Sequence, residues 1–236
     1  MEKYVYMFLH LFTVSYPLAQ SFERRITYYQ KWRFLWPAIV LTGAFFIAWD
    51  VYFAHLGVWS FNDRYLLGYR LLGLPVEEWL FFVTVPFACT FIYEVLNYFI
   101  PKDILKPYVT PVNWVVGVGL LVLAVVFREK FYTSVKFGLT GAFMLGHWWA
   151  FRDRYLGRFY LAYLVSLLPF LLVNGVLTYL PVVSYNNSEN LGIRISDLTG
   201  VAFFNIPIED VVYNLLLLMM IFTIYEMMKA RQTAKS

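Results

Sequence analysis

The chain has 236 residues, of which 61% are hydrophobic and 14% are charged. A soluble domain is about 25% charged, so this composition predicts that much of the surface faces lipid. The formal net charge of +4 is too small, and the chain is too apolar, to indicate a nucleic-acid partner. Cys89 is the single cysteine, which excludes an intramolecular disulfide bond.

The first apolar segment, 4–22, could be mistaken for a secretory signal peptide. Its basic flank is only Lys3, which is offset by Glu2, and the apolar run is long enough to span a bilayer. We therefore expect this segment to remain in the protein as a membrane helix.

Seven windows have the length and apolar character of a membrane-spanning helix, which needs about 20 residues. In chain order they are 4–22, 35–54, 77–99, 110–127, 133–150, 159–180 and 203–228. The fourth window contains no charged residue, whereas the fifth contains Lys136 and His147. The sequence predicts an all-α integral membrane protein with about seven transmembrane helices.

Basic residues between these windows predict the orientation, because lysine and arginine accumulate on the cytoplasmic side. Seven basic residues fall on the side of the N-terminus and twelve on the other side. The twelve are Arg24, Arg25, Lys31, Arg33, Lys102, Lys106, Arg152, Arg154, Arg158, Lys229, Arg231 and Lys235. We expect a multi-pass protein of the cell membrane with its N-terminus outside and its C-terminus in the cytoplasm.

An internal repeat joins the two ends of the chain. The segment "PVEEWLFFVTVPFACTFIYEVL" (75–96) aligns without a gap on "PIEDVVYNLLLLMMIFTIYEMM" (207–228), at an offset of 132 residues. Upstream, "WSFN" (59–62) matches "VSYN" (183–186) at an offset of 124. Because the shared residues are polar and in register, chance similarity between apolar helices explains them poorly.

Each copy of the repeat contains three predicted helices, and the fourth window lies between the copies. A three-helix unit begins and ends on opposite sides of a membrane, so a bridging helix is needed to give both copies the same orientation. We predict a first repeat over 1–101, a bridging transmembrane helix over 102–131 and a second repeat over 132–236. Parallel repeats of this kind differ from the inverted repeats of many transporters.

Two carboxylates stand at the same place in each copy, Glu77 with Glu78 and Glu209 with Asp210. A proline followed by acids is ordinary chemistry for the start of a helix, where the helix dipole favours negative charge. If the acids instead face a dry pocket between the repeats, burial favours the protonated acid, which can act as a general acid. The repetition of the motif favours this functional interpretation.

Other polar residues also lie within the apolar windows, where ionisable groups often mark function. Asp50 and its repeat partner Asn174 are candidate substrate-binding residues, or else they form hydrogen bonds between helices. Glu94 and Glu226 lie toward the far ends of their helices, where pairing with lysine or arginine is expected. His147 is expected to be structural.

A search for cofactor-binding and metal-binding motifs finds none in the sequence. No glycine-rich nucleotide motif and no metal-spaced cluster of cysteine and histidine occurs, so no cofactor or metal is expected. Aromatic residues make up 21% of the chain, which suits a membrane interface and can also stabilise a cation.

The whole chain resembles the integral-membrane lycopene cyclases, the small type without a flavin domain that occurs as two subunits or as their fusion, here the fused form. The resemblance rests on "LPVEEWLFF" (74–82), "IPIEDVVYN" (206–214) and the two three-helix units with a bridging helix. No motif residue departs from the family pattern.

This resemblance implies a lycopene β-cyclase of carotenoid biosynthesis, an isomerase that closes linear carotene end groups without net redox change. An acid would protonate the terminal double bond, the cation would close a ring, and a base would remove a proton. Glu77, Glu78, Glu209 and Asp210 are the expected catalytic residues, and the apolar carotenoid would enter from the bilayer. The sequence leaves open which carboxyl is acid or base, whether the protein forms oligomers, and a proton-coupled membrane transporter or a membrane scaffold as alternatives.

Overall fold

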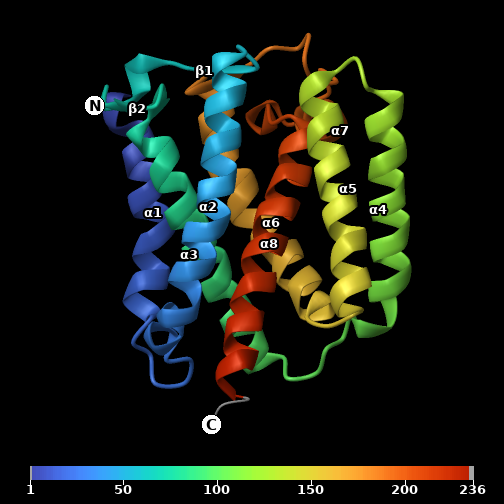
Figure 1. Cartoon of the computed structure of the whole chain (residues 1–236). Coiled ribbons are helices and arrows are strands. Elements are labelled where there is room, and N and C mark those ends of the chain that lie inside the picture. Colours follow the sequence, from blue (N-terminus) through green and yellow to red (C-terminus); the bar gives the residue numbers. More distant parts are fainter. Residues whose placement is uncertain (1, 234–236) are drawn as a thin grey trace. The chain divides into compact units, whose positions relative to one another are not determined.

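The computed structural model describes residues 2–233, and Figure 1 shows its helices and strands. Lys235, one of the twelve basic residues of the predicted cytoplasmic side, lies outside this range. The long helices are α1 (Val5–Gln20), α2 (Trp32–His55), α3 (Val76–Phe99), α4 (Val109–Val126), α5 (Phe131–Phe151), α6 (Leu156–Tyr179) and α8 (Ile208–Thr233). Short elements complete the described chain: α7 (Ile195–Thr199), β1 (Trp59–Phe61), β2 (Arg70–Leu71), β3 (Leu74–Pro75) and β4 (Val183–Tyr185).

Each of the seven predicted windows overlaps one long helix. Among the described residues, five helical segments are long and apolar enough to cross a membrane: 28–55, 76–99, 106–126, 156–179 and 208–232. Helix α1 has only 16 residues, and α5 contains Lys136 and His147, so neither reaches that standard. The protein is therefore helical and membrane-embedded, while seven complete spans stay a prediction.

The described chain divides into two compact units. Unit 1 contains residues up to Pro101, the short segment Leu180–Ser184 and the part of α8 from Leu217 onward. Unit 2 contains Lys102–Tyr179 and Tyr185–Leu216. Helix α8 is thus continuous through both units.

Aromatic side chains fill the core of unit 1. Tyr28 is fully buried and its hydroxyl donates a hydrogen bond to the carbonyl oxygen of Phe87, 2.8 Å away. The rings of Tyr93 and Phe222 stack at 4.7 Å between centroids, which joins α3 to α8. At the N-terminus, a hydrogen bond from the exposed Arg64 guanidinium lowers the pKa of the Glu2 carboxyl.

Close approach of two helices organises unit 2. Gly141 of α5 lies against α4 so tightly that an added Cβ would come within 2.6 Å of the carbonyl oxygen of Gly117. Small residues permit this approach, which maximises van der Waals contact in a medium that supplies no hydrophobic driving force.

A short antiparallel pairing fixes the start of each acid-bearing helix. Before α3, Arg70 pairs with Pro75, and the N–H of Val76 donates to the carbonyl of Tyr69 at 3.0 Å. Before α8, Arg194 pairs with Pro207, and the N–H of Ile208 donates to Ile193 at 3.3 Å. Since proline has no N–H and favours a helix start, both helices begin directly after it.

Candidate active site

The first acid pair lies in the opening turn of α3, within unit 1. Glu77 is fully buried, and its Oε1 accepts a hydrogen bond from the backbone N–H of Leu67 at 2.7 Å. Its Oε2 is buried and has no hydrogen-bond partner among residues 2–233. The neighbouring Glu78 accepts a hydrogen bond from the hydroxyl of Tyr6 on α1 at 2.7 Å.

The second acid pair lies in the opening turn of α8, within unit 2. Glu209 is also fully buried, and its Oε1 accepts hydrogen bonds from the N–H of Leu191 at 2.8 Å and from the hydroxyl of Thr133 at 2.6 Å. Its Oε2 likewise has no partner in the part of the chain that the structure describes. Asp210 accepts a hydrogen bond from the hydroxyl of Tyr132 on α5 at 2.7 Å.

The two pairs therefore have matching supports. Each glutamate is held by the backbone of the loop that precedes its helix, and Leu191 follows Leu67 by the same 124 residues as the upstream repeat. Each second acid is held by a tyrosine from another helix, and Tyr132 follows Tyr6 by 126 residues. A plain helix cap would face solvent, whereas both glutamates are shut away from it.

The two acid pairs differ in the residue that lies one helical turn after the supporting tyrosine. In unit 2 this position is Lys136, whose ammonium lies 3.3 Å from Asp210 Oδ1, contacts the hydroxyl of Tyr132 and sits 4.2 Å from the ring centre of Tyr213. In unit 1 the corresponding residue is His10, which stacks on Tyr6 and pairs with the hydroxyl of Thr84 at 2.9 Å. Unit 2 thus has the ammonium of Lys136 where unit 1 has the imidazole of His10.

The proposed substrate-binding residues Asp50 and Asn174 are both buried, in α2 and α6. The ring of Phe46 on α2 packs against that of Phe82 on α3, with 6.0 Å between their centroids. Asp50 lies one turn after Phe46, and Glu78 lies one turn before Phe82. Asp50 therefore occupies the same end of the α2–α3 contact as the first acid pair. Asn174 belongs to unit 2, and its carbonyl accepts the hydroxyl of Thr178 at 2.8 Å.

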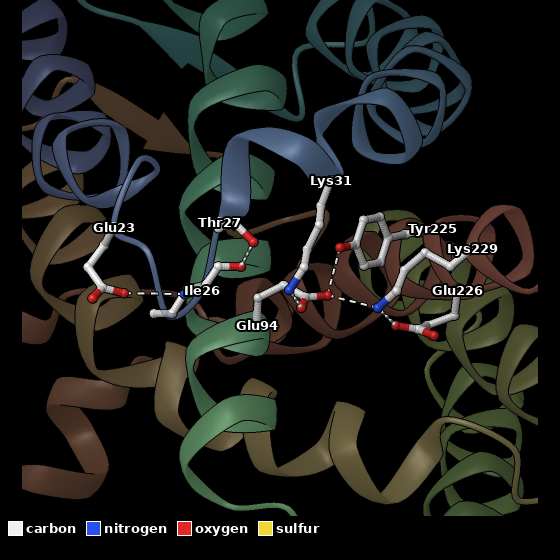
Figure 2. Close-up of polar contacts among 8 residues, drawn as sticks. All are labelled: Glu23, Ile26, Thr27, Lys31, Glu94, Tyr225, Glu226 and Lys229. Carbon is white, nitrogen blue, oxygen red and sulfur yellow. Dashed lines mark hydrogen bonds and ion pairs between the residues drawn. The ribbon is translucent and has the colours of Figure 1, made fainter. Parts of the chain in front are cut away.

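Glu94 and Glu226 form a separate cluster in unit 1, which Figure 2 shows. Glu94 is buried and accepts from the ammonium of Lys31, from Lys229 at 2.9 Å and from the hydroxyl of Tyr225 at 2.6 Å. Lys229 also contacts Glu226 at 2.8 Å. The expected pairing with basic side chains is confirmed. Glu94 lies 17 residues after Glu77, about 25 Å along the helix, so the cluster is distant from the first acid pair.

An apolar cavity of about 410 Å³ lies within unit 2. It is lined by residues of α4, α5, α6 and α8, including Met144, Tyr160, Tyr163, Val211 and Val212. Both tyrosine hydroxyls are engaged, that of Tyr160 with Asn113 and that of Tyr163 with the carbonyl of Val211, so the rings offer only apolar surface. Val211 and Val212 directly follow the second acid pair in the sequence, whereas Glu209 and Asp210 themselves do not line the cavity.

His147 is buried on α5, and its ring lies 5.1 Å from that of Phe151. This environment agrees with the structural role expected for it. Among the described residues, no group of three or more histidine, cysteine, aspartate or glutamate side chains is placed to hold a metal ion.

The supports of the acids are the functional residues that sequence reasoning missed. Tyr6, Tyr132, Lys136 and Thr133 come from α1 and α5, which repeat at an offset of 126, different from the two offsets that the polar motifs display. The aligned segments 5–10 of α1 and 131–136 of α5 share only their tyrosine. An offset of 126 aligns "VYMFLH" (5–10) with "FYTSVK" (131–136), but one shared tyrosine is too weak a signal to identify these residues from the sequence.

Fold and site together define a helical, membrane-embedded protein that holds two carboxyl pairs, each with a fully buried glutamate and beside aromatic side chains. A family model described as Lycopene cyclase matches residues 3–96 and 129–228. The chain therefore belongs to the lycopene cyclase family.

A curated protein is also similar to part of the chain. The "Bifunctional lycopene cyclase/phytoene synthase" of Leptosphaeria maculans is 29% identical over 140 residues, which cover 56% of this chain and 21% of the relative. The matched region thus spans about a fifth of the length of that relative. No solved structure matches the chain.

Proposed function

We propose that this protein is a lycopene β-cyclase, which closes the linear end groups of lycopene to β-ionone rings and yields γ- and β-carotene. The observation that carries this proposal is the pair of buried glutamates, Glu77 and Glu209. Each has one oxygen fixed by a backbone N–H and a second oxygen without a hydrogen-bond partner in the described chain. A carboxyl held by one oxygen, with the other oxygen left without a partner in apolar surroundings, is placed to present a proton to an apolar substrate.

The reaction needs no net electron transfer, so no redox cofactor is required. A carboxylic acid gives its proton to the terminal double bond of the carotene, which leaves a tertiary carbocation and a carboxylate. A carbon–carbon bond then forms between the cation and an inner double bond, which moves the positive charge into the new six-membered ring. A carboxylate removes a ring proton, a double bond forms, and the numbers of protons and electrons are unchanged. Glu77, Glu78, Glu209 and Asp210 share these roles.

The apolar cavity of unit 2 is the proposed binding site for part of the carotenoid. Its volume falls within the range of about 300–1,000 Å³ that is usual for small-molecule sites. Tyr108 and Leu164 on its rim are more than half exposed, which would let a substrate enter from the bilayer. The faces of Tyr160 and Tyr163 could stabilise the carbocation by about 0.5–2 kcal/mol each. Asp50 and Asn174 are further proposed substrate-binding residues.

The proposed architecture is seven transmembrane helices in two parallel repeats. It is supported by the matched supports of the two acid pairs. It is also supported by the two stretches that the family model matches, since these leave out 97–128, which contains the bridging helix α4.

Pigment analysis in a lycopene-producing host tests the function. We expect Glu77→Gln or Glu209→Gln to reduce cyclic carotene by about 100-fold or more, because the amide cannot donate an acidic proton. Glu129→Gln is the matched control, because Glu129 is exposed in the α4–α5 connection. If the wild-type chain leaves lycopene linear, the proposed function is wrong. If both glutamine variants cyclise it normally, the acid assignment is wrong.

A further inference from the structure

The two members of the second acid pair lie side by side in the sequence but have different surroundings. Asp210 accepts from Tyr132 at 2.7 Å on Oδ1 and from Tyr185 at 2.6 Å on Oδ2, and the ammonium of Lys136 lies 3.3 Å from Oδ1. Both oxygens of Asp210 are thus bound by donors, one of them a cation. This arrangement stabilises a carboxylate, since donors and positive charge both favour the ionised form.

Glu209 receives only neutral donors, the hydroxyl of Thr133 and the N–H of Leu191, and both reach the same oxygen. Its other oxygen has no partner among residues 2–233. When two adjacent carboxyls have environments that favour opposite protonation states, the one favoured as neutral serves as acid and the other as base.

Lys136 is the source of this difference. It is 2% exposed and lies over the rings of Tyr132 and Tyr213, at 3.6 Å and 4.2 Å from their centres. Aromatic faces stabilise an ammonium, so the lysine can stay charged in an apolar helix bundle as long as Asp210 balances it. In unit 1 the equivalent position is His10, which carries no obligatory charge.

We propose that Lys136 is a positioning residue that divides the roles within the second acid pair: its ammonium pairs with Asp210, the base, and leaves Glu209, the acid, with neutral donors on one oxygen. This inference rests on the proposed cyclase function. It also makes the two acid pairs unequal, because the position that holds Lys136 beside the second pair is His10 beside the first.

The groups that face Asp210 allow a pH-dependent test. They are Tyr132 and Lys136 of α5, Tyr185 of β4, and Glu209 of α8 itself, with Tyr213 beside the lysine and Arg194 over the ring of Tyr185. Free tyrosine and arginine side chains ionise only above about pH 9, so a change in activity between about pH 5 and pH 9 points to the other groups of this set.

The experiment measures ring formation from lycopene by membranes that contain the full chain, between about pH 5.5 and pH 9. Lys136→Arg keeps the charge, and we expect it to retain most of the activity. For Lys136→Gln we expect a loss of about tenfold or more near pH 6, within the range usual for a general base. That loss should shrink as the pH rises, because removing a neighbouring cation makes a carboxylate base harder to ionise.

The double variant Lys136→Gln with Asp210→Asn separates this role from folding. It removes both buried charges together, so we expect it to accumulate in membranes like the wild type yet to remain inactive at every pH. An active double variant would overturn the proposal, and so would a Lys136→Gln loss that is the same at every pH or absent. If Asp210→Asn and Glu209→Gln are both fully active beside an intact Lys136, the acid site itself is wrong, which is a separate failure.

Discussion

At the scale of single residues, α3 shows how surroundings decide what a glutamate does. Glu77 has one oxygen without a partner, whereas Glu94, on the same helix, binds two ammonium groups and a phenol. The two ammonium groups hold Glu94 in ion pairs, which suits it for joining the turn before α2 to α3 and α8 and not for donating a proton.

Replacing Glu94 should therefore lower stability without changing the chemistry. In Glu94→Gln, Lys31 and Lys229 lose their common anion, and breaking a buried ion pair costs about 3–5 kcal/mol. Both lysine side chains are 28% exposed, so we expect a loss of about 1–3 kcal/mol after screening by solvent. The thermal unfolding temperature of the purified protein measures this loss, with cyclisation per folded molecule unchanged.

Glu226→Gln is the matched control, because Glu226 binds one lysine only and its side chain is more exposed. We expect a smaller fall in unfolding temperature for this variant. Equal unfolding temperatures for the two variants would show that Glu94 is not the centre of the cluster.

The acids of the candidate site could be predicted from the sequence, whereas their partners could not. The motifs place a proline and two acids together, so the start of each helix is visible locally. Tyr6, Lys136 and Tyr185 reach the acids from distant segments, and only tertiary packing brings them there. Whether Glu77 and Glu209 are buried or face water was equally invisible, since a cap and a catalytic acid have the same local sequence.

At the scale of elements, hydropathy located the long helices but misplaced several boundaries, most of all those of the last helix, where the window ends at 228 and α8 ends at Thr233. The last apolar window begins at 203, whereas α8 begins at Ile208. The difference has a physical cause, because Pro207 has no N–H to continue a helix and pairs instead with Arg194. Apolarity alone carries no such information.

The contact between α4 and α5 depends on glycine. In Gly141→Ala the new methyl group would lie 2.6 Å from the carbonyl oxygen of Gly117 and 3.0 Å from Leu121, so the helices must separate. We expect a loss of about 1–3 kcal/mol, as for other overpacked contacts, measured by thermal unfolding in detergent. Gly138→Ala on the same helix is the control, since its methyl group would meet Ala124 at an ordinary 3.7 Å. If the two variants unfold together, the close approach is not needed.

Filling the apolar cavity should impair substrate binding. Met144 lies on the cavity wall and is fully buried, so Met144→Trp would reduce the space beside Tyr160 and Tyr163. We expect a KM for lycopene at least about fivefold higher, with overpacking costing about 1–3 kcal/mol of stability. Met144→Leu, which conserves the volume, is the control. An unchanged KM in a folded Met144→Trp protein would exclude the cavity as the carotenoid site.

At the scale of the whole molecule, the charge distribution predicts a cytoplasmic C-terminus. Cys89 is buried, so an introduced cysteine can be labelled selectively by a thiol reagent that does not cross membranes. We expect Gln30→Cys to react only after cell lysis and Glu129→Cys to react in intact cells, since both positions are exposed and lie on opposite predicted sides. The reverse pattern would invert the orientation.

Because α8 runs through both units, the chain cannot be divided into two independent fragments at the boundary between its predicted repeats. Its first turns carry the acids of unit 2, while Tyr225 and Lys229 near its other end complete the Glu94 cluster of unit 1. A polypeptide cut after residue 101 would hold the whole first sequence repeat, yet it would lack these two partners. The two predicted repeats are therefore similar in sequence without being interchangeable parts. Two separately made fragments would regain the native fold only by reassembling around that one helix.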